Sequence, residues 1–404
     1  MKFIFWSEPT FEHWDWTNPE TKGIGGSETS HIEMSNRLAD RGHEVWSYAP
    51  ITKDSTDDVT HIRGRENPHG VQWFSSEHYG HKAAFHNAKA DVWVIYRAPH
   101  VVELLDENQR AWLVCQDVEY PNMTEAHAER FQLIIALCER HAAHLRLIFP
   151  KQAHKVIVSS NGIRTEAIRK ALGNPPERNP HRLIYASSPD RGFETLGPIY
   201  RLAKEIVPDL ELHVYYGFNN IEKVITRSGA DLRVKNRTDQ IRKWLDAPGV
   251  VHHGRMGQTE LYQEWMKAGI WCHPSAFTET SCITCMDAQA LGAIPITTPT
   301  WAVGENVQHG VFIDGDIAGG DPLTKTRYVY QLVQMALQPE KQEKIRTTMM
   351  PWAQSWFDWE NVADQWEQLA LGENANISFS LKWHQEDTFR CDQGLYGKPK
   401  EVAA

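Results

Sequence analysis

The sequence predicts an α/β protein of two Rossmann-like, doubly wound domains that face each other across a cleft. The chain has 404 residues, which is too many for one ordinary core and suits two domains of about 150–200 residues. Short β-branched and aromatic runs alternate with helical patterns. Several runs are almost continuously apolar, as in a parallel sheet covered on both faces. A proline-rich stretch at residues 171–182 interrupts the alternation, which then begins again.

The first series of expected strands defines an N-terminal domain over residues 1–170. A helix is clearly marked between its first two strands, with Ser27 expected as the N-cap and Gly42 as the residue that ends it. The expected strands are residues 2–6, 43–49, 71–74, 91–97, 111–116, 133–137 and 155–161.

The second series defines a C-terminal domain over residues 183–355. Residues 171–182 hold three prolines and no apolar pattern, so we expect them to form the linker. Expected helices cover residues 190–206, 258–268 and 283–292, and expected strands cover residues 181–187, 211–218, 250–254, 269–275, 294–298 and 310–316.

Beyond this domain, residues 356–370 predict an amphipathic helix with Trp359, Val362, Ala363 and Trp366 on one face. Residues 371–404 are weakly patterned, and we expect them to form a C-terminal tail on the surface.

The composition narrows the classes of partner and compartment. A net charge of −10 and a pI near 6.1 supply no general attraction to nucleic acid or anionic lipid. No stretch approaches the roughly 18 apolar residues of a membrane span, and the first residues do not have the pattern of a signal peptide. Six scattered cysteines show no short disulfide framework. We therefore expect a cytoplasmic protein without integral membrane contact.

The turn between the first strand and the first helix, residues 22–29, contains Gly25 and Gly26. These glycines allow a ligand to approach the backbone, and the N–H groups at the start of the helix suit an anion. The turn matches neither the dinucleotide pattern nor a Walker loop. A turn without a binding role is the alternative.

In the second half, Arg191 lies in a strand-to-helix turn, where its guanidinium suits a diphosphate. The alternative is a surface arginine paired with Asp190 or Glu194. Further along, Glu279 follows a strand and Asp287 lies on the next helix, with helix N–H groups between them. Carboxylates accept from sugar and ribose hydroxyls, and the N–H groups suit phosphate. Carboxylates that serve only the helix dipole and solvation are the alternative.

These residues resemble the donor site of retaining family 4 glycosyltransferases, which have the two-lobed GT-B fold. The family pattern of a strand, Pro-Ser, Glu, seven residues and a second acid is matched by residues 274–287. Ala288, Gly292 and Pro295 follow. The Gly-Gly-Ser-Glu turn, residues 161–163 and the Arg-Gly pair at residues 191–192 appear in the family's order, so the resemblance covers about residues 1–370.

The resemblance implies roles for these residues. Glu279 is expected to bind hydroxyls of the donor sugar, Asp287 the ribose, and Arg191 the leaving diphosphate. The first domain is expected to bind the acceptor, and the helix at residues 356–370 to cross back onto it. Other residues expected at the donor are Gly25 and Gly26 from the first domain, the backbone N–H groups of Thr280, Ser281, Cys282 and Ile283, and Arg255 and Met256 beside the base.

Departures from the family pattern affect the expected chemistry. The second acid is Asp287 where the family usually has Glu. The family often has an arginine before a lysine in the turn after the first strand of the second domain. Here Ser187 and Ser188 occupy the earlier position, and Arg191 occupies the later one. A histidine that commonly follows the fifth strand is replaced by Gln116, so the adjacent Asp117 becomes a candidate base. The alternative is that the leaving phosphate takes the acceptor proton and the protein supplies no base.

Metal and redox motifs are not expected to act. Cys282 and Cys285 form an isolated C-x-x-C that suggests core packing. Asp314 and Asp316 resemble a metal-binding pair, but their place fits a loop, and the histidines from residue 61 to residue 100 lack ligand spacing. We expect no metal and no cofactor beyond a UDP- or GDP-sugar as donor substrate.

The sequence therefore predicts a metal-independent glycosyltransferase, with hexosyl or related transfer from a nucleotide-diphosphate sugar. The acceptor stays open among a glycan, a lipid-linked sugar, a small molecule and a hydroxylated DNA base, which the acidic charge disfavours. A sugar-nucleotide epimerase or hydrolase and a non-catalytic nucleotide-sugar-binding protein are the alternatives. Residues that would matter for a flipped base are Trp14, Trp16, Trp73, Arg63 and Arg65.

Overall fold

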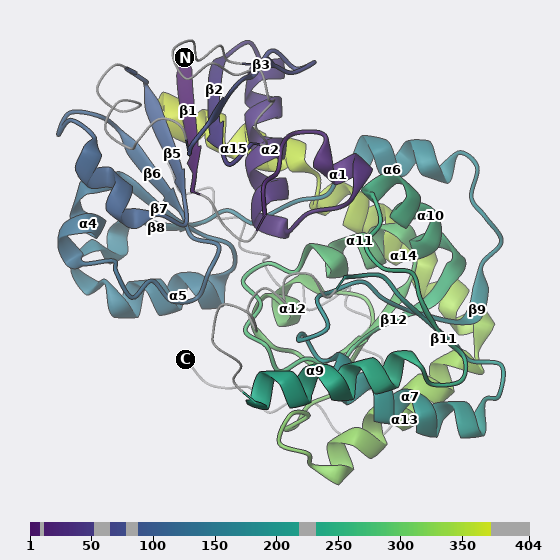
Figure 1. Cartoon of the computed structure of the whole chain (residues 1–404). Coiled ribbons are helices and arrows are strands. Elements are labelled where there is room, and N and C mark those ends of the chain that lie inside the picture. The colour runs from purple at the N-terminus through teal and green to yellow at the C-terminus, as the bar shows by residue number, and fades with distance from the viewer. Residues whose placement is uncertain (9–11, 52–64, 78–87, 218–231, 373–404) are drawn as a thin grey trace. The chain divides into compact units, whose positions relative to one another are not determined.

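The computed structural model describes residues 1–8, 12–51, 65–77, 88–217 and 232–372. They form two compact units (Figure 1). The first unit comprises Met1–Thr165, Thr278–Ile283 and the helical residues from Trp356 onward. The second comprises Glu166–Phe277 and Thr284–Ser355. Each unit is built on its own mainly parallel sheet.

The sheet of the first unit has the strand order β3-β4-β2-β1-β5-β6-β7-β8. All its pairs are parallel except β3 with β4. Chain order reverses between β1 and β5, which makes that position the topological switch point of the unit. The strands are β1 (Lys2–Ser7), β2 (Glu44–Ala49), β3 (Arg65–Glu66), β4 (Gln72–Ser75), β5 (Val92–Tyr96), β6 (Ala111–Val114), β7 (Leu133–Ala136) and β8 (Val156–Val158).

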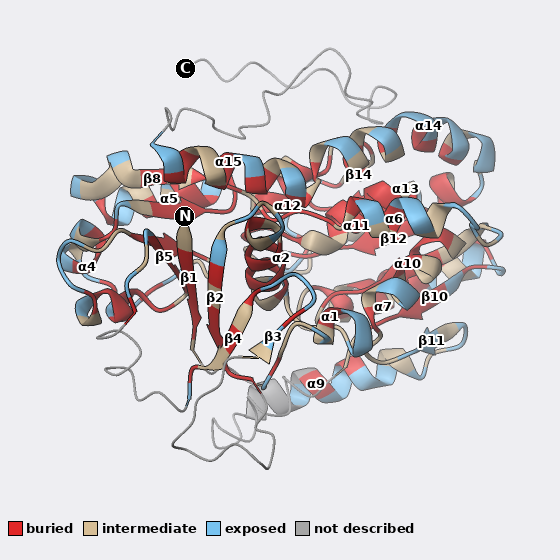
Figure 2. Ribbon diagram, turned by 90° about the horizontal axis from the view of Figure 1, so that it is seen from above, coloured by how far each residue is buried: buried red, intermediate tan, exposed pale blue. Residues whose placement is uncertain are grey.

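Helices cover both faces of this sheet because side chains along its buried strands alternate between two cores. Phe3 and Phe5 belong to one core, with residues of α2 (Gly26–Asp40) and α15 (Trp359–Leu371). Ile4 and Trp6 belong to the other, with residues of the 3-10 helix η1 (Pro99–Leu104), α4 (Glu125–Arg130) and α5 (Glu139–Ile148). Figure 2 shows these central strands buried along their length. A second 3-10 helix, η2 (Pro150–Lys155), precedes β8, and a short helix, α1 (Asn18–Thr21), precedes α2.

The sheet of the second unit is entirely parallel, with the order β11-β10-β9-β12-β13-β14. Its switch point lies between β9 and β12. The strands are β9 (Asn179–Tyr185), β10 (Glu211–Val214), β11 (Val250–His252), β12 (Ala268–His273), β13 (Ile294–Thr297) and β14 (Val311–Phe312). The helices are α6 (Thr165–Leu172), α7 (Phe193–Ile206), α9 (Leu232–Leu245), α10 (Gln258–Lys267), α11 (Ile283–Leu291), α12 (Trp301–Asn306), α13 (Pro322–Ala336) and α14 (Pro339–Trp356).

Some local predictions differ from the structure. The N-cap of α2 is Gly25 and not Ser27, because the N–H of Thr29 already donates to the Gly25 carbonyl at 3.0 Å. Helix α6 ends at Leu172 and β9 begins at Asn179, so the stretch expected as a linker is partly regular structure. The expected tail from residue 373 onward lies outside the described residues.

Helix α15 packs beside α2 in the first unit, and its four predicted apolar-face residues are buried. Gly162 permits the close approach of the chain that leads into α15. An added Cβ there would lie 2.7 Å from the Phe357 carbonyl oxygen and 2.9 Å from the Trp359 ring. The backbone N–H of Ile163 also donates to the Phe357 carbonyl at 2.7 Å.

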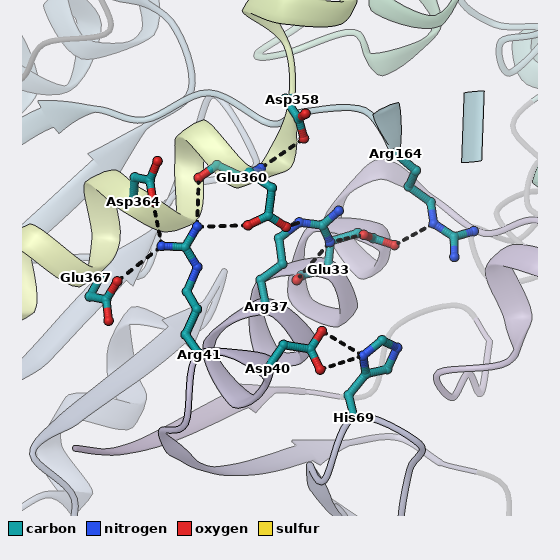
Figure 3. Close-up of polar contacts among 10 residues, drawn as sticks. All are labelled: Glu33, Arg37, Asp40, Arg41, His69, Arg164, Asp358, Glu360, Asp364 and Glu367. Carbon is teal, nitrogen blue, oxygen red and sulfur yellow. Dashed lines mark hydrogen bonds and ion pairs between the residues drawn. The ribbon is translucent and has the colours of Figure 1, made fainter. Parts of the chain in front are cut away.

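Ion pairs join the polar faces of the same two helices (Figure 3). The Arg41 guanidinium binds Glu360 at 2.8 Å, Asp364 at 2.6 Å and Glu367 at 3.1 Å. Arg37 also reaches Glu360, at 3.0 Å. One arginine that serves three carboxylates of α15 fixes which face of that helix meets α2.

Candidate functional site

Two loops meet at the carboxyl edge of the second unit's sheet, where β9 and β12 lie side by side. The loop after β9 carries Arg191 and Gly192, and the loop after β12 begins at Pro274 and includes Phe277. Gly192 has a φ of 110°, and an added Cβ would lie 2.5 Å from the Pro274 carbonyl oxygen. Only glycine fits both the left-handed backbone and this contact. The switch point of the unit therefore brings Arg191 to the loop after β12.

Arg191 stacks on an aromatic ring. Its guanidinium carbon lies 3.2 Å from the centroid of the Phe277 ring, and its Nε lies 3.6 Å from an Asp190 oxygen. The pairing with Asp190 that the sequence offered as an alternative is thus present, but the stack on Phe277 was not predicted. Stacking on the ring fixes the plane of the guanidinium.

His273 ends β12 and is fully buried. Its ring stacks on Trp271, with 4.9 Å between centroids and an angle of 11° between planes. Burial, reinforced by the nearby positive charge of Arg191, lowers the pKa of His273 to about 3. The imidazole of His273 is therefore neutral, and Arg191 is the positively charged side chain of this pair.

Helix α11 places Asp287 in its second turn, where the side chain is buried. The first turn is linked to the loop after β9, because the Ser187 and Thr284 hydroxyls lie 3.1 Å apart. Ser187 stands where the family resemblance leads one to expect a cation. Here its hydroxyl connects the loop after β9 to the first turn of α11 instead.

Glu279 lies in the segment Thr278–Ile283, which groups with the first unit. Within that unit the Thr280 hydroxyl donates to the Gln116 carbonyl at 2.9 Å. Gly26 also borders the segment, since an added Cβ there would lie 3.3 Å from Cδ1 of Ile283. Cys282 has a φ of 62°, in the left-handed region that favours glycine. The segment thus turns sharply just before α11 begins.

Arg255 and Met256 follow β11 at the same carboxyl edge of the second sheet. The Arg255 guanidinium carbon lies 5.8 Å from the centroid of the Tyr216 ring. Its Cγ would lie 3.1 Å from a Cβ added at Gly217. The loops after β10 and β11 therefore pack together through Arg255.

The first unit contains a cavity of about 240 Å³ at the carboxyl ends of β1, β5 and β6. This is the switch point of that unit, where doubly wound sheets bind ligands. The N-terminal turn of α2 forms another part of the wall. The lining residues are Ser7, Glu8, Trp14, Ser27, Glu28, Tyr96, Arg97, Ala98 and Asp117.

Asp117, the candidate base, is bound through both carboxylate oxygens. Nε of Arg97 donates to one oxygen at 2.7 Å, and a terminal N–H of Arg97 donates to the other at 2.8 Å. Arg97 adopts a φ of 63°, which is rare for a residue with a side chain. The turn after β5 thus holds Arg97 in a conformation in which it binds both oxygens of Asp117.

Gly25 and Gly26 lie at the start of α2, beside the Glu28 carboxylate. A Cβ added at Gly25 would overlap with that carboxylate. Burial raises the pKa of Glu28, partly offset by the positive charge of Arg97. A carboxylate of the protein therefore occupies the space beside the helix start where the sequence suggested a ligand phosphate.

Of the aromatic residues considered for a flipped base, Trp14 alone lines the cavity. Trp73 is fully buried, with its ring centroid 6.1 Å from that of Trp14 and 5.5 Å from that of Trp16. Arg65 lies in the edge strand β3, and Arg63 lies outside the described residues.

The described part of the chain contains neither a metal cluster nor a membrane-spanning helix. Among those residues, no group of three or more His, Cys, Asp or Glu side chains is placed to hold a metal ion. The side chains of Cys282 and Cys285 are buried and are not joined in a disulfide. No helix in the described ranges is long and apolar enough to cross a bilayer.

Several residues of these sites were missed from the sequence. Arg97 directly follows a buried strand, and this position was a usable signal. Glu28 belongs to the Gly-Gly-Ser-Glu turn, but its carboxylate was not singled out. Phe277 lies two residues before Glu279, and nothing in the sequence marks it as the partner of Arg191.

No protein-family model matches the chain, and no curated protein matches its sequence. Solved structures do match. Sucrose-phosphate synthase from Thermosynechococcus elongatus is 14% identical, with a TM-score of 0.66 over 92% of this chain and 98% of that chain. HepE of Anabaena in complex with UDP-glucose is 15% identical, with a TM-score of 0.60 over 92% of this chain and 100% of that chain. AviGT4, a glycosyltransferase involved in avilamycin A biosynthesis, is 13% identical, with a TM-score of 0.56 over 92% of this chain and 98% of that chain.

The chain therefore has the fold of GT-B glycosyltransferases, and the prediction of two Rossmann-like domains is confirmed. At these identities the similarity concerns the fold alone. Function has to be argued from the residues at the two switch points.

Proposed function

We propose that this chain is a glycosyltransferase that moves a sugar from a nucleotide-diphosphate sugar to an acceptor hydroxyl. The observation that carries the proposal is the placement of Arg191, stacked on Phe277, at the switch point of the second unit. Ligands of doubly wound sheets bind at such points, and a guanidinium there suits a diphosphate. The similarity to HepE, whose structure holds UDP-glucose, supports the same class of donor.

In this proposal Arg191 and Asp287 of the second unit hold the diphosphate and the ribose of the donor. Arg191 stabilises the negative charge that develops on the diphosphate as the bond to the sugar breaks. Glu279 accepts hydrogen bonds from hydroxyls of the donor sugar, and Asp287 accepts them from the ribose. Further contacts come from the backbone N–H groups of Thr280, Ser281, Cys282 and Ile283, and from Arg255 and Met256 beside the base.

The proposed reaction retains the configuration of a hexosyl group carried by UDP or GDP. The leaving phosphate takes the proton of the acceptor hydroxyl, so the reaction requires no protein base. Arg191 and the backbone N–H groups stabilise the charge of the diphosphate, so the proposed reaction uses neither a metal nor a cofactor. The protein acts mainly by positioning the two substrates and by stabilising charge. Both carboxylate oxygens of Asp117 accept hydrogen bonds from Arg97. We therefore assign Asp117 a positioning role beside the acceptor.

The acceptor binds the first unit, at the cavity beside β1 and β5. Glycans, lipid-linked sugars and small molecules are the acceptor classes we retain for a protein that acts in the cytoplasm. A hydroxylated DNA base is disfavoured, because the net charge is −10 and acidic side chains line the cavity.

Calorimetric titration with UDP, GDP, ADP and UMP tests the donor site without requiring an acceptor. We expect one nucleoside diphosphate to bind, and Arg191→Ala to weaken it about tenfold or more, as for a lost hydrogen bond to a charged group. The matched control is Arg201→Ala, which changes an arginine of α7, the helix that follows the Arg191 loop. This variant should bind the diphosphate like wild type. Absence of binding by any diphosphate would contradict the proposal.

A further inference from the structure

The cavity of the first unit is small. Its volume is about 240 Å³, below the roughly 300–1,000 Å³ of pockets that hold drug-sized ligands. It lies where β1, β5 and the start of α2 converge, and a single monosaccharide-sized group is the size of ligand that it suits.

The charges on its wall are unfavourable for an anion. Arg97 is the arginine among the lining residues, and both oxygens of Asp117 already neutralise it, at 2.7 and 2.8 Å. Glu8 and Glu28 remain as lining carboxylates. Glu8 meets His100 at 3.0 Å, and the Glu28 carboxylate lies beside Gly25 at the start of α2. The helix terminus that would attract a phosphate is therefore already occupied by a carboxylate of the protein.

Glu28 is in an environment that favours hydrogen-bond donors from a ligand. The Glu28 side chain is half-buried in the cavity wall, and this partial loss of contact with water raises its pKa. A desolvated carboxylate gains from O–H groups that replace the lost water, and it repels a second anion strongly in a medium of low dielectric constant.

Two aromatic side chains complete the wall. Trp14 is 1% exposed, and its indole N–H donates to no residue in the described part of the chain. Tyr96 is also 1% exposed and lines the same cavity. At 1% exposure neither ring offers a face to a sugar, but the indole N–H of Trp14 supplies a donor for one ring or hydroxyl oxygen.

We propose that this cavity binds the acceptor as a neutral, polyhydroxylated ring and rejects acceptors that carry a phosphate or carboxylate on that ring. The assignment as an acceptor site rests on the glycosyltransferase function proposed above. Glu28 and Glu8 accept hydrogen bonds from ring hydroxyls, and Trp14 donates one. The same two carboxylates exclude the phosphorylated ring.

Saturation-transfer NMR on the full chain without donor tests this binding directly. The probes are matched pairs: D-glucose, D-mannose, D-fructose and N-acetyl-D-glucosamine, each with its 6-phosphate. We expect at least one neutral sugar to bind and its 6-phosphate to bind about tenfold more weakly or not at all, given the size of charge repulsion in a partly buried site.

Variants connect the result to the cavity. Glu28→Gln should weaken binding of the neutral sugar. It should also lower the ratio between the affinities for the neutral sugar and for its 6-phosphate by about tenfold. Glu8→Gln should change both the affinity and the ratio in the same direction. Trp14→Phe should weaken only the binding of the neutral sugar. Glu107→Gln, an exposed position of the same unit, should leave both affinities unchanged. Thermal unfolding of each variant establishes that it is folded.

The outcomes separate this inference from the proposed function. Phosphorylated sugars that bind as well as neutral ones, failure of every probe to bind, or unchanged discrimination in both Glu28→Gln and Glu8→Gln would overturn the inference. Binding of a nucleoside diphosphate would stand independently of those results. Conversely, the chain could bind a neutral sugar in the cavity and show no affinity for nucleotides. That result would overturn the transferase proposal, and the preference of the cavity for neutral sugars would stand.

Discussion

The guanidinium of Arg191 lies over the ring of Phe277, 3.2 Å from its centroid, although the two residues are 86 positions apart in the chain (277 − 191). They meet because β9 and β12 are neighbouring parallel strands whose following loops leave the sheet at the same edge. Phe277 is 39% exposed, which is unusual for a phenylalanine beside a well-packed strand end. The stack accounts for its position there.

Phe277→Leu removes the ring and should leave Arg191 less firmly oriented. A partly exposed cation–π contact contributes about 0.5–1 kcal/mol, so we expect donor KM to rise about two- to fivefold, with a smaller change in kcat. Phe277→Tyr retains the ring and should behave like wild type. Steady-state kinetics with varied donor concentration measures the effect, and equal KM values for Leu and Tyr would refute the role of the stack.

Cys282 is held at a φ of 62°, immediately before α11. The left-handed region costs a residue with a side chain about 1–2 kcal/mol, and a β-branched residue more. We expect Cys282→Val to lower the free energy of unfolding by about 1–2 kcal/mol and Cys282→Gly to leave it nearly unchanged, since relief of strain offsets the added entropy of the unfolded chain. Urea denaturation distinguishes the two. A valine variant as stable as the glycine variant would show that the turn is not strained.

Gly162→Ala places a Cβ against the Phe357 carbonyl and the Trp359 ring. Neither neighbour is the end of a flexible chain, so the start of α15 has to move, at a cost of about 1–3 kcal/mol. Hydrogen exchange should show α15 losing protection before the sheet of the first unit does. Gly173→Ala, whose Cβ would meet one carbonyl at 3.2 Å, is the milder control. Wild-type protection of α15 in Gly162→Ala would contradict the packing account.

Acid should destabilise the protein through its buried histidines. Burial lowers the pKa of His31 and His273 to about 3, whereas the unfolded chain takes up these protons near pH 6.5. Between those values the unfolded state binds more protons, so stability falls as the pH falls. Each histidine contributes at most about 1.4 kcal/mol per pH unit, and its contribution to stability is fully present above pH 6.5.

His273→Phe separates this titration from packing. Both ring nitrogens of His273 lack partners in the described ranges, so phenylalanine should retain the stack on Trp271 and flatten the dependence of unfolding free energy on pH between about 6.5 and 4.5. His31→Phe should instead lose stability near neutral pH, because His31 bonds to Ser7 at 2.7 Å and Ser47 at 2.6 Å, and this loss should shrink as the pH falls. Urea denaturation at several pH values measures both. A pH dependence unchanged in His273→Phe would exclude this histidine as a source.

The strands were predictable because those buried on both faces appear in the sequence as continuous apolar runs. Each expected strand has a counterpart, including β12 and β13 on either side of the Glu279 segment. The short edge strand β3 was not predicted, since the two residues Arg65 and Glu66 carry no periodicity.

The sites were predictable only in part, because their pairings depend on which strands become neighbours. Arg191 was identified by its position after a strand, and Asp117 by the family resemblance, as the neighbour of Gln116. Their partners Phe277 and Arg97 come from other strands of the same sheets, and no local pattern connects them. The left-handed backbone at Arg97 and Cys282 is imposed by tertiary contacts, since neither residue type favours it.

Release of nucleoside diphosphate from a panel of UDP-, GDP- and ADP-sugars, measured on the full chain with and without candidate acceptors, tests the central claim most directly. The account predicts turnover of at least one donor and loss of most of that turnover in Arg191→Ala and Glu279→Ala, with stability little changed. If no donor is turned over and none raises the melting temperature, the chain is not a glycosyltransferase of this kind. Wild-type rates in both variants would show that these residues do not hold the donor.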